Sequence, residues 1–81
     1  VDLIIETAEK LFAVEIKASK NVGVTDLRGL HSFRENIVNA SLKKNLESRV
    51  VYLGERRQKF DEGTLVYSLQ DFFEEINSLP H

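Results

Sequence analysis

Two stretches of alternating apolar and polar residues lie close together at the start of the chain. The first covers residues 1–6 and the second covers residues 11–18. A period of two is typical of a β-strand, in which successive side chains point to opposite faces of a sheet. Only residues 7–10 connect the two stretches, and a connection of this length favours a β-hairpin. The sequence therefore predicts that the chain opens with two antiparallel strands.

Helical and strand-like patterns alternate along the rest of the chain, with Thr25 and Ser68 as expected helix N-caps. The expected segments are a helix at 25–39, a connection at 40–47, a buried strand at 49–53, a charged loop at 55–63, a strand at 64–67 and a helix at 69–77. The first helix is long enough to set the second and third strands parallel through a right-handed crossover. We expect an α/β fold in the order β-β-α-β-β-α, a mixed β-sheet flanked by helices.

Gly29 lies inside the first expected helix, where glycine costs about 1 kcal/mol relative to alanine. Two explanations stay open. The glycine permits close packing of the helix against the sheet, or it is merely tolerated.

Composition limits the classes of function. The chain has 81 residues and no cysteine, which excludes disulfides, thiolate zinc sites and cysteine nucleophiles. A net charge of −2 argues against free-standing nucleic-acid binding, because neutralisation of phosphates supplies most non-specific affinity. No apolar run approaches the roughly 20 residues that span a bilayer. We expect a cytoplasmic domain without membrane contact, excised from a longer protein, since no methionine is present and Val1 already lies in a strand pattern.

Asp2, Glu15 and Lys17 are the residues that carry chemical information. In a symmetric hairpin Asp2 lies opposite Glu15, with Cβ atoms about 4.5–5.5 Å apart, and Lys17 points to the same side. Facing carboxylates destabilise a sheet, but Mg²⁺ is held by one or two carboxylates, waters and phosphate oxygens. We interpret Asp2 and Glu15 as ligands of Mg²⁺ or Mn²⁺, with the carbonyl of Ile16 as a further ligand. Lys17 would orient the attacking water or stabilise charge on phosphorus during phosphodiester hydrolysis.

At these residues the sequence resembles the PD-(D/E)XK, or restriction-endonuclease-like, superfamily. The pattern of an aspartate on one strand and Glu-x-Lys on the next is present as Asp2 and as Glu15, Ile16 and Lys17, although Val1 replaces the usual proline. More narrowly, the chain resembles the C-terminal domain of unknown function of prokaryotic AAA+ ATPases. The segments that carry this resemblance are residues 1–6, 14–20, 26–30 and 51–54.

The resemblance implies that residues 1–81 are the C-terminal part of one nuclease-like domain, a partial restriction-endonuclease-like core whose first helix and strand precede Val1. It also implies a Mg²⁺- or Mn²⁺-dependent endonuclease that acts on DNA and contacts its own N-terminal ATPase region. Some ATPase-linked members have degenerate sites, so the alternative is a non-catalytic interaction module that retains the nuclease fold.

Less specific explanations also stay open. Asp2, Glu15 and Lys17 form a solvated strand face if Lys17 pairs with Glu15 or Glu6, which is worth less than about 1 kcal/mol when exposed. His31 lies beside Arg28 and Arg34, where it contacts a phosphate or is simply solvated. The exposed edge of the first strand allows pairing with a second copy, so a homodimer is a further hypothesis. Two basic groups are either solubilising or a nucleic-acid track: Lys43, Lys44 and Arg49, and Arg56, Arg57 and Lys59.

Overall fold

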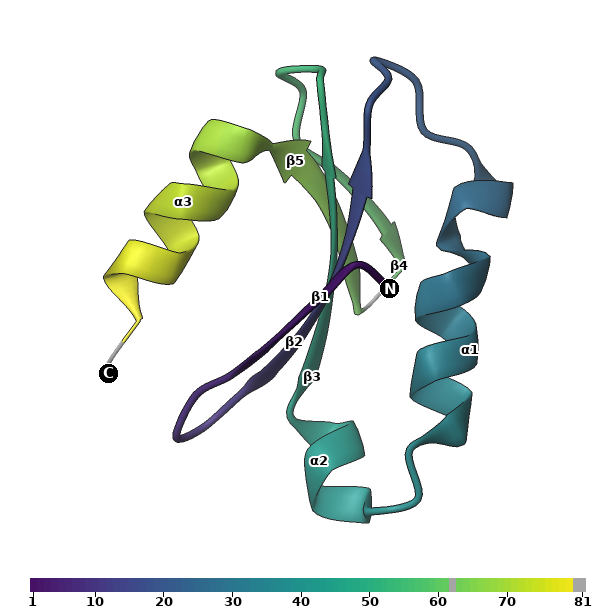
Figure 1. Cartoon of the computed structure of the whole chain (residues 1–81), viewed down its shortest axis with the longest axis vertical. Helices are drawn as coiled ribbons and strands as arrows, with labels where there is room; N and C mark the ends of the chain where they lie inside the picture. Colours follow the sequence, from purple (N-terminus) through teal and green to yellow (C-terminus); the bar gives the residue numbers. More distant parts are fainter. Residues whose placement is uncertain (62, 80–81) are drawn as a thin grey trace.

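The computed structural model describes residues 1–61 and 63–79 and shows a mixed sheet with helices on both faces (Figure 1). The strands are β1 (Leu3–Glu6), β2 (Leu11–Lys17), β3 (Leu46–Tyr52), β4 (Gln58–Asp61) and β5 (Thr64–Ser68). The helices are the 3₁₀ turn η1 (Val24–Leu27), α1 (Arg28–Asn36), α2 (Ala40–Lys44) and α3 (Leu69–Ser78). Within the described part of the chain, no helix combines the length and the apolar character needed to cross a membrane.

The strands lie in the order β1-β2-β3-β5-β4. Strands β2, β3 and β5 are parallel, and β1 and β4 pair antiparallel with their neighbours at the two edges. The parallel pairing of β2 with β3 confirms the crossover predicted from the sequence, and the mixed sheet is confirmed with it. Pairing of a second copy along the β1 edge stays a prediction.

The β1–β2 hairpin has the predicted register. Leu3 pairs with Val14, and Glu6 pairs with Leu11, which places Asp2 opposite Glu15. The turn closes without glycine because the Thr7 hydroxyl oxygen accepts the backbone N–H of Lys10 at 2.9 Å. The backbone N–H of Thr7 donates in turn to the Lys10 carbonyl at 2.8 Å.

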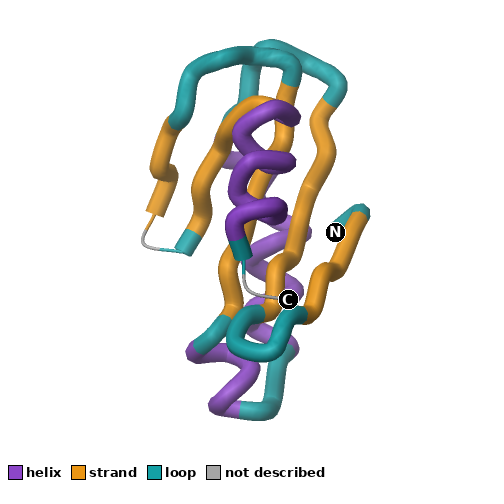
Figure 2. The backbone as a smooth tube through the Cα atoms, turned by 90° about the vertical axis from the view of Figure 1, so that its left-hand side faces the viewer, coloured by secondary structure: helices purple, strands orange, loops and turns teal. Residues whose placement is uncertain are grey.

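Each face of the sheet has its own apolar core. On one face, Leu27 and Leu30 of η1 and α1 pack over Leu11 and Ala13 of β2. On the other face, α3 covers the middle of the sheet, as Figure 2 shows, and Phe72 packs in a cluster with Phe12, Val14, Val51 and Tyr67. The central strands are therefore buried on both sides, as parallel strands usually are.

This two-sided burial corrects one expectation about β2. The alternation over residues 11–18 predicts one apolar face that consists of Phe12, Val14, Ile16 and Ala18. Ile16 is instead 57% exposed and Ala18 is exposed, because the core on the α3 face ends near Val14 and Val51. The apolar side chains of Leu11 and Ala13 are buried on the opposite face.

The structure also differs from the sequence prediction at the ends of elements. Strand β4 lies where a charged loop was expected. The sequence pattern missed it because Phe60 is its one apolar residue packed against the core, and a single apolar residue produces no period. The first helix begins with η1 rather than at an N-cap Thr25, and α1 ends at Asn36. Helix α2 occupies the expected connection, where the Asn39 side chain accepts the backbone N–H of Leu42 at 3.0 Å. The predicted N-cap of α3 is confirmed, since Ser68 Oγ accepts the Asp71 N–H at 3.1 Å.

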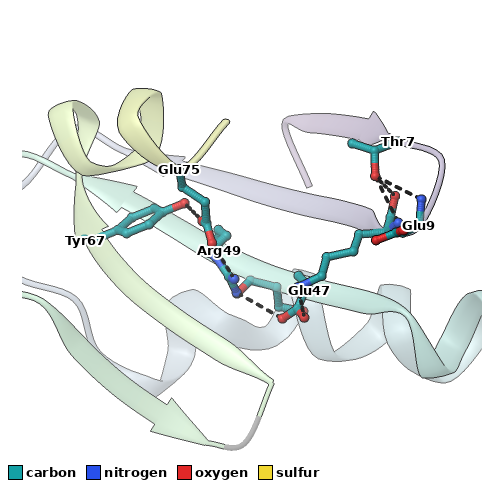
Figure 3. A network of polar contacts seen from close by, with 8 residues as sticks. Thr7, Glu9, Glu47, Arg49, Tyr67 and Glu75 are labelled. Atoms are coloured by element: carbon teal, nitrogen blue, oxygen red, sulfur yellow. Dashed lines mark hydrogen bonds and ion pairs between the residues drawn. The ribbon is translucent and has the colours of Figure 1, made fainter. Parts of the chain in front are cut away.

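A charged network joins α3 to the middle of the sheet (Figure 3). The Arg49 side chain on β3 is 8% exposed, and its Nε and Nη2 donate to the two carboxylate oxygens of Glu75 at 2.9 and 3.1 Å. The Tyr67 hydroxyl donates to the same carboxylate. The Arg49 guanidinium also lies 5.5 Å from the centre of the Phe12 ring. Arg49 is therefore a buried structural residue, so its predicted membership in a surface basic group with Lys43 and Lys44 is wrong.

Replacing Glu75 with glutamine should lower the free energy of unfolding by about 3 kcal/mol, because the buried Arg49 guanidinium loses the nearer of two carboxylates and keeps that of Glu47, at 3.5 Å. The free energy of unfolding is measured by urea denaturation monitored by circular dichroism. The matched control is Glu74→Gln on the exposed side of the same helix, which should change stability by less than about 0.5 kcal/mol. Equal effects of the two substitutions would contradict the structural importance of the pair.

The same network predicts a pH dependence. Burial opposes ionisation of Glu75, but hydrogen bonds from Arg49 and Tyr67 outweigh it and hold the Glu75 pKa below its ordinary value of 4.5. A carboxyl whose pKa is lower in the folded state stabilises the fold above its unfolded pKa and loses that contribution as pH falls. The stability difference between wild type and Glu75→Gln should therefore be full at pH 7 and should shrink below pH 4.5. A difference that stays constant in urea titrations down to pH 3 would argue against this ionised pair.

Candidate functional site

A cleft of about 530 Å³ lies where the C-terminal end of β2 meets η1 and the start of α1. Its lining consists of Val1, Glu15, Ile16, Lys17, Ala18, Thr25, Asp26 and Gly29. Two of the residues predicted to carry chemistry, Glu15 and Lys17, therefore lie in one cleft. Asp2 lies beside it, opposite Glu15 in the register of the hairpin.

Asp2 is exposed and is held by the backbone of the neighbouring strand. Its Oδ2 accepts the N–H of Ile16 at 2.8 Å, while its own N–H donates to the Val14 carbonyl at 2.9 Å. The Ile16 N–H lowers the Asp2 pKa, and a side-chain hydrogen-bonding contact with Glu15 lowers it further. The hairpin register places the two residues at facing positions, and the Ile16 N–H favours the ionised form of Asp2.

Glu15 lies against the first turn of α1. Its Oε1 lies 3.1 Å from the backbone nitrogen of Val1. A Cβ atom added at Gly29 would lie only 3.2 Å from the same oxygen. Of the two explanations for Gly29, the structure therefore supports the close approach: the helix carries a glycine where the Glu15 carboxylate needs the space.

Lys17 pairs with neither Glu15 nor Glu6, the two partners considered from the sequence. Its Nζ lies 2.5 Å from Oδ1 of Asp26, so pairing with Glu15 or Glu6 is not what the structure shows. Asp26 is anchored by its other oxygen, Oδ2, which accepts the N–H of Gly23 at 2.8 Å. The ion pair with Lys17 and the Gly23 hydrogen bond both lower the pKa of Asp26.

Asp26 is the site residue that the sequence did not reveal. An acidic residue in the first turn of a helix already has an ordinary explanation in the helix dipole, so its sequence position gave no second signal. Only the fold brings η1 beside the end of β2 and places this carboxylate next to Lys17.

Asp2 and Glu15 would supply two carboxylates to a cation, and Ile16 also lines the cleft. Among residues 1–61 and 63–79, no group of three or more histidine, cysteine, aspartate or glutamate side chains is placed to hold a metal. Two carboxylates with water and substrate oxygens suit Mg²⁺ or Mn²⁺, whereas a closed protein cage is not formed there.

The basic residues that the sequence suggested as possible nucleic-acid contacts are not part of this site. His31 and Arg34 line a separate cavity of about 510 Å³ together with Lys44. Arg28 is not among the residues that line it. In the other basic group, Arg57 Nε lies 3.7 Å from Oδ2 of Asp71. The lining of the cleft beside Asp2 includes none of these described basic residues.

Comparison with known proteins adds one positive finding. Residues 1–72 match the model of a family described as Domain of unknown function (DUF4143). Comparisons with curated proteins and with solved structures gave no match. The family match spans most of the chain and includes the hairpin, the cleft and all five described strands, so the chain belongs to the DUF4143 family.

Proposed function

We propose that this chain is a metal-dependent, nuclease-like domain of an ATPase-linked protein that hydrolyses DNA phosphodiester bonds. The observation that carries the proposal is the placement of Asp2 and Glu15 at facing positions of adjacent strands, beside a cleft that also contains Lys17. DUF4143 domains are commonly found at the C-terminus of AAA ATPases, which supports the linkage to an ATPase. We also propose that the domain is related to the restriction-endonuclease-like enzymes.

The electrostatics of the pair support cation binding. Two adjacent carboxylates repel each other in a sheet, and a strand without a function gains nothing from that arrangement. The Ile16 N–H nevertheless favours the ionised form of Asp2, and Gly29 leaves room for the Glu15 carboxylate. The local structure therefore maintains negative charge where a divalent cation would bind.

Each residue then has a defined task. Asp2 and Glu15 hold the cation, and the Ile16 carbonyl is available as a further oxygen ligand. A bound Mg²⁺ or Mn²⁺ supplies polarisation of the phosphoryl group and a lowered pKa for a water. The Lys17 ammonium stabilises negative charge that develops on the phosphate oxygens, or orients the attacking water.

A second function is favoured by a separate observation. Two of the three predicted site residues already have partners among the described residues: the Ile16 N–H for Asp2 and the Asp26 carboxylate for Lys17. The net charge of −2 also opposes attraction to DNA. A non-catalytic module that contacts an ATPase region is therefore the alternative.

Metal binding can be tested without a substrate. Millimolar Mn²⁺ should raise the melting temperature of wild type, since a ligand at a hundredfold excess over its dissociation constant stabilises the folded state by about 2.7 kcal/mol. Asp2→Asn and Glu15→Gln should lose this shift, while the stability of their metal-free forms changes by less than about 1 kcal/mol. The matched control is Glu6→Gln on the same hairpin, which should shift like wild type. Equal shifts in all four proteins would favour the interaction module.

Cleavage is tested with the intact protein that carries this domain, because a loosely supported site loses positioning. Wild type should nick plasmid DNA with Mn²⁺ and not with a chelator. Lys17→Met should reduce the rate about 100-fold, the usual effect of removing a group that stabilises transition-state charge. Lys20→Met, in the exposed loop after β2, is the control and should leave the rate unchanged. A metal-binding protein without cleavage would make the nuclease proposal untenable.

A further inference from the structure

The ion pair between Lys17 and Asp26 determines where the ammonium group of Lys17 lies in the cleft. Lysine carries a compact charge on a flexible four-carbon stem, so its backbone position alone does not place the ammonium group. Asp26 is oriented because its two oxygens have separate donors, Gly23 N–H on Oδ2 and Lys17 Nζ on Oδ1. The side chains of Lys17 and Asp26 are 31% and 24% exposed, so the pair is partly shielded from water.

Without Asp26, Lys17 would have another acid within reach. Glu15 lies two residues earlier on the same face of β2, about 7 Å along the strand, and lines the same cleft. A lysine side chain is long enough to cross that distance. Pairing of Lys17 with Glu15 would neutralise one of the two proposed metal ligands.

Building on the proposed function, we propose that Asp26 is a positioning residue that holds Lys17 away from Glu15 and so keeps the Asp2–Glu15 pair free to bind a divalent cation. Asp26 acts through Lys17 and does not contact the cation. The anchoring bond from Gly23 places Asp26 on η1, across the cleft from β2, so the docking of η1 against the sheet sets the separation of the lysine from the metal ligands.

The substitution Asp26→Asn isolates the charge. An asparagine side-chain oxygen still accepts the Gly23 N–H, so η1 keeps its local structure, but the attraction for Lys17 is lost. Mn²⁺ affinity, measured by calorimetry on the intact protein, should fall about fivefold, the effect expected of one ion pair of about 1 kcal/mol. Circular dichroism checks that the variant is folded.

The double variant Asp26→Asn with Lys17→Met is the deciding experiment. Removing the lysine removes the group that neutralises Glu15, so Mn²⁺ affinity should return to the wild-type value or exceed it. A merely structural role of Asp26 would give weak binding in both variants, and that result would overturn the inference.

The outcomes separate this inference from the proposed function. Wild type that fails to bind Mn²⁺ overturns the metal-site proposal and the inference with it. Wild type that binds while Asp26→Asn binds equally well overturns the inference alone. Weakened binding in Asp26→Asn that Lys17→Met restores supports both.

Discussion

The two-sided pairing of β2 is the constraint on which the rest of the domain depends. The strand is antiparallel to β1 and parallel to β3, and its first four residues are buried on both faces. A helix is therefore needed on each side of the sheet, and α1 and α3 meet that need. The last three residues of β2 extend past this core, so polar side chains there remain accessible while the backbone that carries them is fixed.

The buried arginine on β3 has a different role. Arg49 is surrounded by aromatic rings and a carboxylate, an environment in which an unpaired cation would be very costly. Helix α3 supplies Glu75 only when it lies at one position along the sheet. The pair therefore adds a directional contact that favours one docking of α3, beside the apolar contacts of Phe72, Ile76 and Leu79.

Local patterns predicted much of this fold because several elements are determined by neighbouring residues. The hairpin register follows from a short loop and a period of two, and the α3 cap follows from Ser68 and its spacing to Asp71. Strand β4 and the burial of Arg49 depend on long-range contacts, which leave no periodic signal in the sequence. Of the candidate site, Asp2, Glu15 and Lys17 were predicted from alternation and spacing. Asp26 was not, because its role depends on where η1 docks.

Gly29 offers a means of comparing members of the family by inspection. A Cβ atom at this position would lie 3.2 Å from the Glu15 carboxylate, so even alanine forces a displacement of a few tenths of an ångström, and a longer side chain forces a larger one. Sequences that keep glycine there retain the notch in α1 that accommodates an acidic side chain from the sheet. In sequences with a bulky residue at that position, the notch would be smaller, and an acid aligned with Glu15 would have to shift further. The side chain at this one helical position thus sets how closely α1 can approach a residue aligned with Glu15.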